Sequence, residues 1–539
     1  MRPGRVRSKS RIRSGNGQHT ILRGAIVPLM LDAAVCERAR LSRDARFDGR
    51  FVVGVVTTGI YCRPVCPVQP PRAANVRFYR SSAAAARAGF RPCLRCRPET
   101  APGSPAWSGT PATVRRALRL IDEGALDRAA TEHLAQRLGV GARQLRRLFD
   151  RHVGASPLEV ASTRRIHRAK QLIDVTDLPF AAVAQAAGFG SVRRFNDALH
   201  DAYGRTPREL RSRRRQATAN GALRLRLHYR APYDATGLLH FLARRAIPGV
   251  EVVDVTRGTY QRTFRLTTGR HGGGGRPGCP PAQAAAGILC VEARCDQYMG
   301  AEVCHQDARV LLDVAGRLRR LFDLDADPLS FGRHLASSPL LSTRIDALPG
   351  VRVPGAWDGF ETAVRAILGQ QVTVKGATTL AGRLVDALGE ALPDALLAPG
   401  LARTFPSPEA VSAFDLRAIG VPAGRTAALR ALAEAVADGR LHLGPTADPD
   451  ATRARLTTIP GIGSWTAEYI AMRVLRDPDA FPAGDLGLRK AVAPGRPVDA
   501  QALRTMAEAW RPWRAYAAML LWQHGRGQPR GERDAQVVP

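Results

Sequence analysis

Two closely spaced pairs of cysteines limit how the N-terminal part of the chain can fold. Cys62 and Cys66 form one pair, Cys93 and Cys96 form the other, and 26 residues separate the pairs. Two pairs on separate loops can present four thiolates to one Zn²⁺ ion in a tetrahedral arrangement without strain. The chain has nine cysteines, and an odd number in a long chain argues against a disulfide framework. The spacing therefore predicts a small domain built around zinc.

The residues around the cysteines resemble a known family. The runs that carry the resemblance to the N-terminal domain of the Ada-type adaptive-response regulators are Phe51–Val55, Thr57–Pro64, Asn75–Tyr79 and Gly89–Cys96. The alternating apolar residues over 51–56 also predict a strand. The resemblance implies that all four cysteines bind zinc and that Cys62 accepts a methyl group from DNA methyl phosphotriesters. This role suits a thiolate, which is a nucleophile that zinc keeps deprotonated.

The same family has a second methyl acceptor in a Pro-Cys-His-Arg context, which this chain lacks. The nearest candidate is Cys304, which has neither the proline nor the arginine, so we expect an ordinary helix residue and no direct repair of O-alkylated bases. Three arginines lie next to the zinc ligands in the sequence: Arg63, Arg91 and Arg95. Their positive charges favour a position of the cluster against the phosphates of the DNA backbone. Arginines this common could also be solvated surface.

A repeated pattern organises the predicted helical segment over 111–215. The run Leu134–Gly141 recurs as Val183–Gly190, and each copy ends in Gly-x-(Ser/Thr)-Pro. A short glycine-containing turn lets a second helix enter the major groove of DNA. Two such copies resemble the AraC-type DNA-binding domain. The expected DNA-contacting residues on the outward faces of the second helices are Arg143, Arg146, Arg193 and Arg194.

Another turn pattern lies near the C-terminus. The run Ile459–Gly463 reads Ile-Pro-Gly-Ile-Gly between two predicted helices. Such a turn exposes backbone N–H groups at a helix N-terminus. These groups bind a DNA phosphate without reading the base sequence. With the downstream Asp485, the turn resembles the helix-hairpin-helix DNA glycosylases. The resemblance implies DNA binding through Gly461 and Gly463 and catalysis by Asp485. As an alternative or an additional role, Asp485 could cap the helix that begins at Leu486.

Further runs extend the resemblance to 3-methyladenine DNA glycosylase II over about residues 222–525. These runs are Pro232–Asp234, Phe241–Ala246, Ala363–Val372 and Trp510–Ala517. The resemblance implies a pocket that binds a flipped-out, positively charged base through aromatic faces, formed by Trp465, Tyr469, Trp522 and Phe241. Each of these could singly be a core aromatic. Gln371 matches the position that fills the vacated base stack, where an apolar residue is usual.

Two absences refine the expected chemistry. Bifunctional relatives carry a lysine where this chain has Trp465, so we expect a monofunctional glycosylase that forms no Schiff base. No cysteine follows Cys304, so the iron–sulfur loop of other relatives is missing. The only cofactor expected is therefore Zn²⁺.

The charge balance favours a polyanionic partner. Lysine and arginine number 80 against 47 aspartates and glutamates, a formal net charge of +33. GC-rich coding sequence could explain the arginines but not the shortage of acidic residues, and such a field concentrates nucleic acid. We expect double-stranded DNA, both alkylated and promoter DNA, as the partner. No run of about 18 uncharged apolar residues occurs, so no membrane partner is expected. The protein is expected to be a cytoplasmic, nucleoid-associated monomer.

The length of 539 residues exceeds what one hydrophobic core can organise. The expected fold class is multidomain: a small α+β zinc domain, an all-α double helix-turn-helix, then an α+β subdomain with an all-α helix-hairpin-helix glycosylase domain. The expected limits are 1–29 for a disordered basic tail or non-native leader, 30–105 for the zinc domain, 110–216 for the helix-turn-helix pair, 221–345 and 346–528 for the two glycosylase parts, and 529–539 for a tail. The start codon could be Met1 or Met30.

The sequence thus predicts a methyl-accepting zinc sensor and regulator fused to a monofunctional glycosylase that excises N-alkylated purines such as 3-methyladenine. Two alternatives stay open. One is a transcription factor that uses the glycosylase fold only as a lesion sensor, which Asp485 and Trp465 disfavour. The other is a zinc-thiolate redox sensor, which the match around Thr58–Cys62 disfavours.

Overall fold

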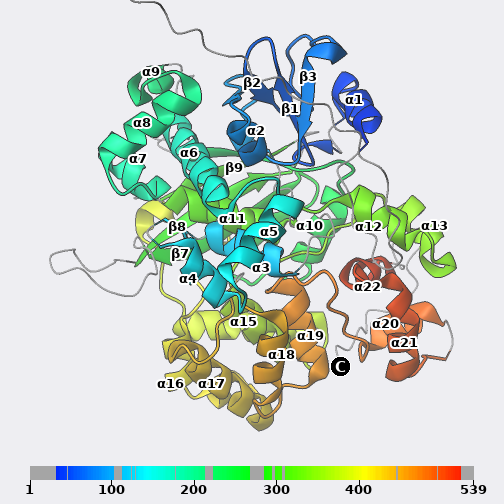
Figure 1. Cartoon of the computed structure of the whole chain (residues 1–539). Helices are drawn as coiled ribbons and strands as arrows, with labels where there is room; N and C mark the ends of the chain where they lie inside the picture. The colour runs from blue at the N-terminus through cyan, green and yellow to red at the C-terminus, as the bar shows by residue number, and fades with distance from the viewer. Residues whose placement is uncertain are drawn as a thin grey trace, which may run out of the picture.

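The computed structural model describes residues 32–44, 47–101, 112–122, 124–127, 129–175, 178–212, 223–267, 284–293, 298–305, 310–444, 447–493 and 496–523. The tails predicted at 1–29 and 529–539 lie outside these ranges. Figure 1 shows a small sheet module at the N-terminus, a helical module, a second sheet and a C-terminal group of helices. The predicted multidomain class is confirmed. No helix in the described ranges is long and apolar enough to cross a bilayer.

The N-terminal module is a four-stranded sheet with two helices. Its elements are α1 (Ala33–Leu41), β1 (Val52–Val55), β2 (Ile60–Cys62), β3 (Val76–Tyr79), α2 (Ser82–Arg87) and β4 (Arg91–Pro92). The strand order is β3-β1-β2-β4, with β1 antiparallel to both neighbours and β2 parallel to β4. The strand predicted over 51–56 is therefore confirmed. Gly54 is needed in β1, because a Cβ there would lie 2.8 Å from the Tyr79 ring.

The helical module contains the predicted repeat. Its helices are α3 (Ala112–Asp122), α4 (Thr131–Arg137), α5 (Ala142–His152), α6 (Pro157–Val175), α7 (Phe180–Ala187), α8 (Val192–Tyr203) and α9 (Pro207–Ser212). The turns α4–α5 and α7–α8 pass through Gly139 and Gly188, whose φ values of +68° and +96° favour glycine. The long helix α6 joins the halves, because Val160 packs in the first core and Leu172 in the second.

The second sheet opens the C-terminal half. Its strands are β5 (Leu223–His228), β6 (Glu251–Asp254), β7 (Thr259–Thr267), β8 (Ala284–Glu292) and β9 (Tyr298–Cys304), arranged antiparallel in the order β5-β9-β8-β7-β6, and α10 (Ala235–Ala243) follows β5. The prediction that Cys304 lies in a helix is wrong. Cys304 ends β9 and pairs with Ile288 of β8, and burial alternates along β9 with the period of two that a strand requires.

Helices form the rest of the chain. They are α11 (Leu311–Leu321), α12 (Pro328–Leu335), α13 (Pro339–Ala347), α14 (Gly359–Leu368), α15 (Val374–Leu388), α16 (Pro408–Ala413), α17 (Ala423–Ala437), α18 (Pro449–Thr457), α19 (Ser464–Arg473), α20 (Leu486–Val492), α21 (Ala500–Ala507) and α22 (Arg514–Trp522). One hydrophobic core runs from the second sheet into these helices; Phe264 of β7 and Ile367 of α14 both belong to it. The sheet and the helices therefore fold as one packed body.

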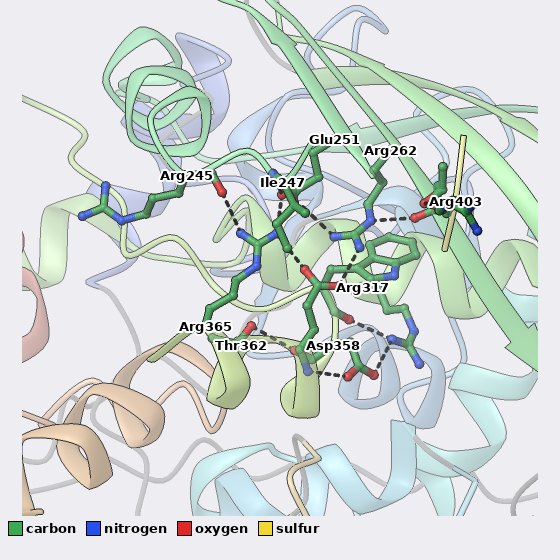
Figure 2. Close-up of polar contacts among 12 residues, drawn as sticks. Arg245, Ile247, Glu251, Arg262, Arg317, Asp358, Thr362, Arg365 and Arg403 are labelled. Carbon is green, nitrogen blue, oxygen red and sulfur yellow. Dashed lines mark hydrogen bonds and ion pairs between the residues drawn. The ribbon is translucent and has the colours of Figure 1, made fainter. Parts of the chain in front are cut away.

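A buried ionic cluster fixes the sheet to α14, as Figure 2 shows. Arg262 of β7 donates to Glu361 of α14 at 2.8 Å, and Arg365 of α14 pairs with both Glu361 and Glu251 of β6. Burial alone would raise the pKa of Glu251, but Arg365 and Arg262 outweigh it and hold the pKa at about 2. Because each buried charge has a partner, the cluster sets the position of α14, which leads into the loop that carries Gln371.

Candidate functional site

The four predicted metal ligands converge at one end of the first sheet. Cys62 ends β2, Cys93 directly follows β4, and the Sγ atoms of Cys62, Cys66, Cys93 and Cys96 all lie within 4.8 Å of one another. Cys62 and Cys66 are half-buried, whereas Cys93 and Cys96 are 7% and 6% exposed. Four thiol sulfurs gathered this closely form the donor set that a structural zinc site requires.

The arginine after Cys62 does not face solvent, so it supports neither a position of the cluster against the DNA backbone nor a solvated surface. Arg63 is 6% exposed, and its Nε donates to Oδ1 of Asp48 at 3.0 Å while Nη1 donates to the Cys96 carbonyl oxygen at 3.1 Å. The Asp48 carbonyl oxygen in turn accepts from Nε of the buried Arg230, just beyond β5, at 2.8 Å. Arg63 therefore connects the cysteine cluster to the second sheet module. Arg91 and Arg95 are exposed, as a DNA-facing surface would require.

The residue before Cys62 contacts a different module. The hydroxyl of Tyr61 lies 2.9 Å from Nε2 of His167 on α6, and Tyr61 is 1% exposed. Burial lowers the pKa of His167 to about 4, with a smaller contribution from the charge of Arg164, so this imidazole is neutral at physiological pH. Close by, the side-chain amide of Gln171 on α6 donates to the Glu99 carbonyl oxygen at 2.7 Å. The cysteine module is thus anchored on the helix that joins the two helix-turn-helix halves.

The helices predicted to enter DNA grooves present charged faces to solvent. Arg143 and Arg146 on α5 are exposed, and so are Arg193 and Arg194 on α8. Arg146 also reaches Glu132 at 2.8 Å, but both side chains are more than half exposed, so this ion pair restrains the arginine little. All four predicted contact residues are therefore free to meet a phosphate or a base edge.

The second predicted DNA-binding turn lies between α18 and α19. Gly461 has φ of +87° and Gly463 is the N-cap of α19; both are exposed, and their neighbouring N–H groups lie at a helix N-terminus. The side-chain amide of Gln370 donates to the Gly461 carbonyl oxygen at 3.0 Å and to the Thr466 hydroxyl at 2.9 Å. Gln371, the predicted wedge residue, is exposed beside this turn with φ of +53°.

The predicted catalytic carboxylate lies beyond this turn and is 8% exposed. Asp485 is the N-cap of α20: its Oδ1 accepts from the Leu488 backbone N–H at 2.9 Å, which confirms the predicted capping role. The same Oδ1 accepts from the indole Nε1 of Trp522 at 2.9 Å, and Oδ2 accepts from the indole Nε1 of Trp465 at 3.2 Å. Three predicted site residues from α19, α20 and α22 are therefore joined directly.

The remaining predicted pocket residues are held by two arginines. Tyr469 stacks on Trp465 with ring centroids 5.3 Å apart and planes 15° apart. Arg473 donates to the Tyr469 hydroxyl at 2.6 Å, and the guanidinium carbons of Arg245 and Arg473 lie 3.9 Å and 4.8 Å from the ring centre of Phe241. Phe241 is only 6% exposed. Phe241 is therefore in contact with charged side chains, and Arg473 links it to Tyr469, because the same guanidinium carbon lies 5.5 Å from the Tyr469 ring centre.

The two arginines were missed in the sequence, although a spacing signal was present. Each follows a predicted pocket aromatic by four residues, Arg245 after Phe241 and Arg473 after Tyr469, and residues so spaced meet on a helix surface. Burial alone would raise the pKa of the Tyr469 phenol, but Arg473 and Arg245 outweigh it and hold the pKa below its ordinary value. The charges nearest this phenol are therefore positive.

Comparison with known families matches all four modules. The matching models are "Metal binding domain of Ada" for residues 35–99, "Helix-turn-helix domain" for 134–213, "AlkA N-terminal domain" for 224–358 and "HhH-GPD superfamily base excision DNA repair protein" for 364–515. The first of these covers the four-cysteine cluster, so zinc as the cofactor is confirmed. The order of the models along the chain is the order predicted from the sequence.

Individual relatives show how the modules combine. The "Probable bifunctional transcriptional activator/DNA repair enzyme AlkA" of Mycobacterium tuberculosis is 46% identical over 493 residues, which cover 90% of this chain and 95% of that protein. "DNA-3-methyladenine glycosylase 2" of Escherichia coli is 34% identical over 307 residues, covering 56% of this chain and 98% of that protein. "Bifunctional transcriptional activator/DNA repair enzyme Ada" of Escherichia coli is 31% identical over 171 residues, covering 32% and 47%.

The mycobacterial match spans every module, whereas the two Escherichia coli proteins match the C-terminal and N-terminal parts separately. The structure agrees with this division, because the cysteine cluster lies in the first module and the Asp485 site in the last. The chain therefore belongs to the family of AlkA-type bifunctional transcriptional activator/DNA repair enzymes, in which an Ada-type zinc-binding domain and a helix-turn-helix domain precede a helix-hairpin-helix glycosylase.

Proposed function

We propose that this protein is a monofunctional DNA glycosylase that excises N-alkylated purines, such as 3-methyladenine, from double-stranded DNA. We also propose that it is a sequence-specific regulator whose Cys62 accepts methyl groups from DNA phosphotriesters. The observation that carries the excision activity is the convergence of two indole N–H groups and a helix N-terminus on Asp485. A carboxylate oriented in this way can stabilise a positive charge that develops beside it.

Binding of the damaged duplex would begin at the hairpin. The exposed Gly461 and Gly463 leave room for a phosphate at the N-terminus of α19, and Gln370 holds the preceding loop against this turn. A phosphate held here fixes the register of the duplex without reading its sequence. Gln371 on the adjacent exposed loop would enter the space that the flipped nucleotide leaves.

Excision would follow at Asp485. The bond between C1′ and the base nitrogen breaks, and its electron pair leaves with the base. The sugar then carries the positive charge that Asp485 stabilises. Water adds to C1′ and loses one proton, which leaves an abasic site. An N3- or N7-alkylated purine is already cationic, so it departs as a neutral molecule. Its departure therefore needs little protonation by a general acid.

Recognition of the cationic base falls to the aromatic side chains near Asp485. Trp465 and Tyr469 form one stacked wall, and Trp522 is half-buried on the other side of the carboxylate. Aromatic faces attract cations by about 0.5–2 kcal/mol each, more when the cation is desolvated. Arg245 and Arg473 contact Tyr469 of this wall and orient its hydroxyl. No amine lies at position 465, so the reaction is expected to stop at the abasic site.

Methyl transfer is proposed for the cysteine cluster. When bound, zinc keeps its thiolate ligands deprotonated and nucleophilic at neutral pH. The Sγ of Cys62 attacks the methyl carbon of the phosphotriester, an S–C bond forms, and the C–O bond breaks with its electron pair leaving on the phosphodiester. Cys62 is accessible enough for this attack, whereas Cys93 and Cys96 are buried. Cys66 is equally half-buried, so the choice of Cys62 rests on the resemblance of its surrounding residues.

One experiment tests both activities together. The purified protein is incubated with duplex DNA treated with a methylating agent, and released bases and protein-bound methyl groups are measured separately. Free 3-methyladenine and one methyl group on Cys62 are the expected products. A protein that binds the damaged duplex but releases no base would instead support the lesion-sensing transcription factor. Transfer of no methyl group, with oxidation of the cluster changing DNA binding, would support the redox sensor.

A further inference from the structure

The carboxylate of Asp485 is almost fully occupied by donors. Its two oxygens offer about four lone-pair positions. Oδ1 accepts from the Leu488 N–H and the Trp522 indole, each at 2.9 Å, and Oδ2 accepts from the Trp465 indole at 3.2 Å. Among the described residues these three donors leave a single open position, on Oδ2. The donors thus select which oxygen can meet the sugar or a water molecule.

The two indoles contribute more than a flat surface. An indole N–H is a donor that lies in the ring plane, so a tryptophan that donates to Asp485 turns its ring edge toward the carboxylate. Trp465 has one face against Tyr469, and its N–H on Asp485. The same two rings that would contact the base are therefore tied to the catalytic oxygens, and the separation between base and carboxylate is fixed by hydrogen bonds.

A glycine permits this arrangement. Gly487 lies in the first turn of α20, and a Cβ added there would lie 3.0 Å from Oδ1 of Asp485 and 3.5 Å from the ring of Trp522. The 3.0 Å contact is tight enough that the carboxylate would have to shift by a few tenths of an ångström, whereas 3.5 Å from the indole is an ordinary contact. Gly484, just before the same helix, differs, because a Cβ there would meet only Trp465 at the ordinary distance of 3.9 Å.

We propose that Trp465 and Trp522 are positioning residues for the excision reaction, acting through their indole N–H groups on Asp485, and that Gly487 leaves the space in which Oδ1 of Asp485 accepts from Trp522. The proposal rests on the excision activity proposed above and goes beyond base stacking. It predicts that removing an N–H while keeping the ring lowers the excision rate and leaves DNA binding intact, since only the carboxylate loses its alignment.

The test replaces each tryptophan in turn with β-(3-benzothienyl)alanine, in which sulfur takes the place of the N–H in a ring of the same shape. Single-turnover release of 3-methyladenine and the Kd for a duplex containing a tetrahydrofuran abasic site are measured for each full-length variant. We expect release to fall at least about 10-fold and Kd to change less than about 3-fold. An unchanged rate of release would overturn the proposal.

Two further measurements separate this proposal from the proposed function. Gly487→Ala should reproduce the loss of rate, and Gly484→Ala should release base at the wild-type rate; equal effects of the two would contradict the role of Gly487. The indole ¹H–¹⁵N resonances of Trp465 and Trp522 should shift on Asp485→Asn more than those of the other four tryptophans. A wild-type protein without base release would refute the excision activity, whereas absence of these resonance shifts would refute the hydrogen bonds themselves.

Discussion

The Tyr61 hydroxyl lies 2.9 Å from Nε2 of His167, and this contact joins the strand that ends at Cys62 to the helix between the two helix-turn-helix halves. On the other side of Cys62, Arg63 pairs with Asp48, whose carbonyl oxygen accepts from Arg230 in the second sheet module. Tyr61 thus contacts the helical module directly, and Arg63 is linked to the second sheet module through Asp48. A structural change at Cys62 can therefore reach each of these modules through one or two hydrogen bonds.

The Tyr61–His167 contact predicts a pH-dependent stability. Burial lowers the pKa of His167 to about 4, below the ordinary value of 6.5, so the folded state holds this imidazole neutral while the unfolded state gains a proton. The contribution of the neutral His167 to the free energy of unfolding is on the order of 2–3 kcal/mol. It is complete above about pH 6.5 and is lost as the pH falls toward 4. Unfolding midpoints at pH 7.5 and 5.0 should differ less for His167→Gln than for wild type. Equal pH dependence of the two proteins would contradict the assignment.

Zinc removal should unfold the N-terminal module selectively. Metal analysis of protein purified without chelator is expected to give one Zn²⁺ per chain, and Cys66→Ser should lose it, because three thiolates bind the ion less well than four. Cys290→Ser is the matched control, since Cys290 is also half-buried but lies on β8, outside the cluster. If Cys66→Ser and the wild type contained the same amount of zinc, this result would contradict the assignment of the four cysteines as ligands.

Methylation of Cys62 should strengthen specific DNA binding by α5 and α8. Four thiolates around Zn²⁺ carry a formal charge of −2, and one methyl group reduces it to −1. If the cluster faces the DNA backbone, the relieved repulsion is worth on the order of 1–3 kcal/mol, roughly 5- to 150-fold in affinity. The exposed Arg91 and Arg95 favour that orientation. The effect should weaken at high salt, because solvent ions screen exposed charges.

The measurement compares affinity for a binding site selected from random DNA before and after exposure to methyl-phosphotriester DNA. Wild type should gain affinity, and Cys62→Ser should not. A Tyr61→Phe variant, which keeps the ring but loses the contact with His167, tests whether the link to α6 carries part of the change. Equal affinity of wild type in both states would leave the zinc module as a repair or docking module only.

The sequence predicted the features that depend on local spacing. The cysteine pairs, the two glycine turns and the downstream Asp485 each follow from residues close in the chain, and the structure brings the cysteines together and places Trp465 and Trp522 on Asp485. Hydrogen-bond geometry at these positions is set by helix and strand ends, which short motifs specify well.

Features that depend on a distant partner could not be predicted this way. The sequence places Arg63 against the DNA backbone or on a solvated surface, because it does not reveal that Arg63 is buried in a pair with Asp48. Arg473 reaches the backbone carbonyls of Pro354 and Gly355, which lie far from it in the sequence. Cys304 was assigned to a helix, because only its pairing with Ile288 on the neighbouring strand identifies it as part of a sheet.

The absence of an amine at position 465 predicts the outcome of reductive trapping. Borohydride added during base release should capture no covalent protein–DNA adduct, because Trp465 cannot form a Schiff base with the sugar. A bifunctional glycosylase incubated in parallel provides the positive control. Efficient trapping of this protein would contradict the monofunctional assignment and would require another nucleophile at the site.

The most direct test of base excision is the rate of 3-methyladenine release by Asp485→Asn under single-turnover conditions. Asparagine caps a helix about as well as aspartate, so α20 should stay intact while the negative charge is lost. Asp499→Asn is the matched control, because the Asp499 side chain also caps a helix, α21, away from the site. The account predicts at least about a 100-fold loss of release for Asp485→Asn, with Kd for alkylated duplex nearly unchanged, and no loss for Asp499→Asn. Near-wild-type release by Asp485→Asn would contradict it.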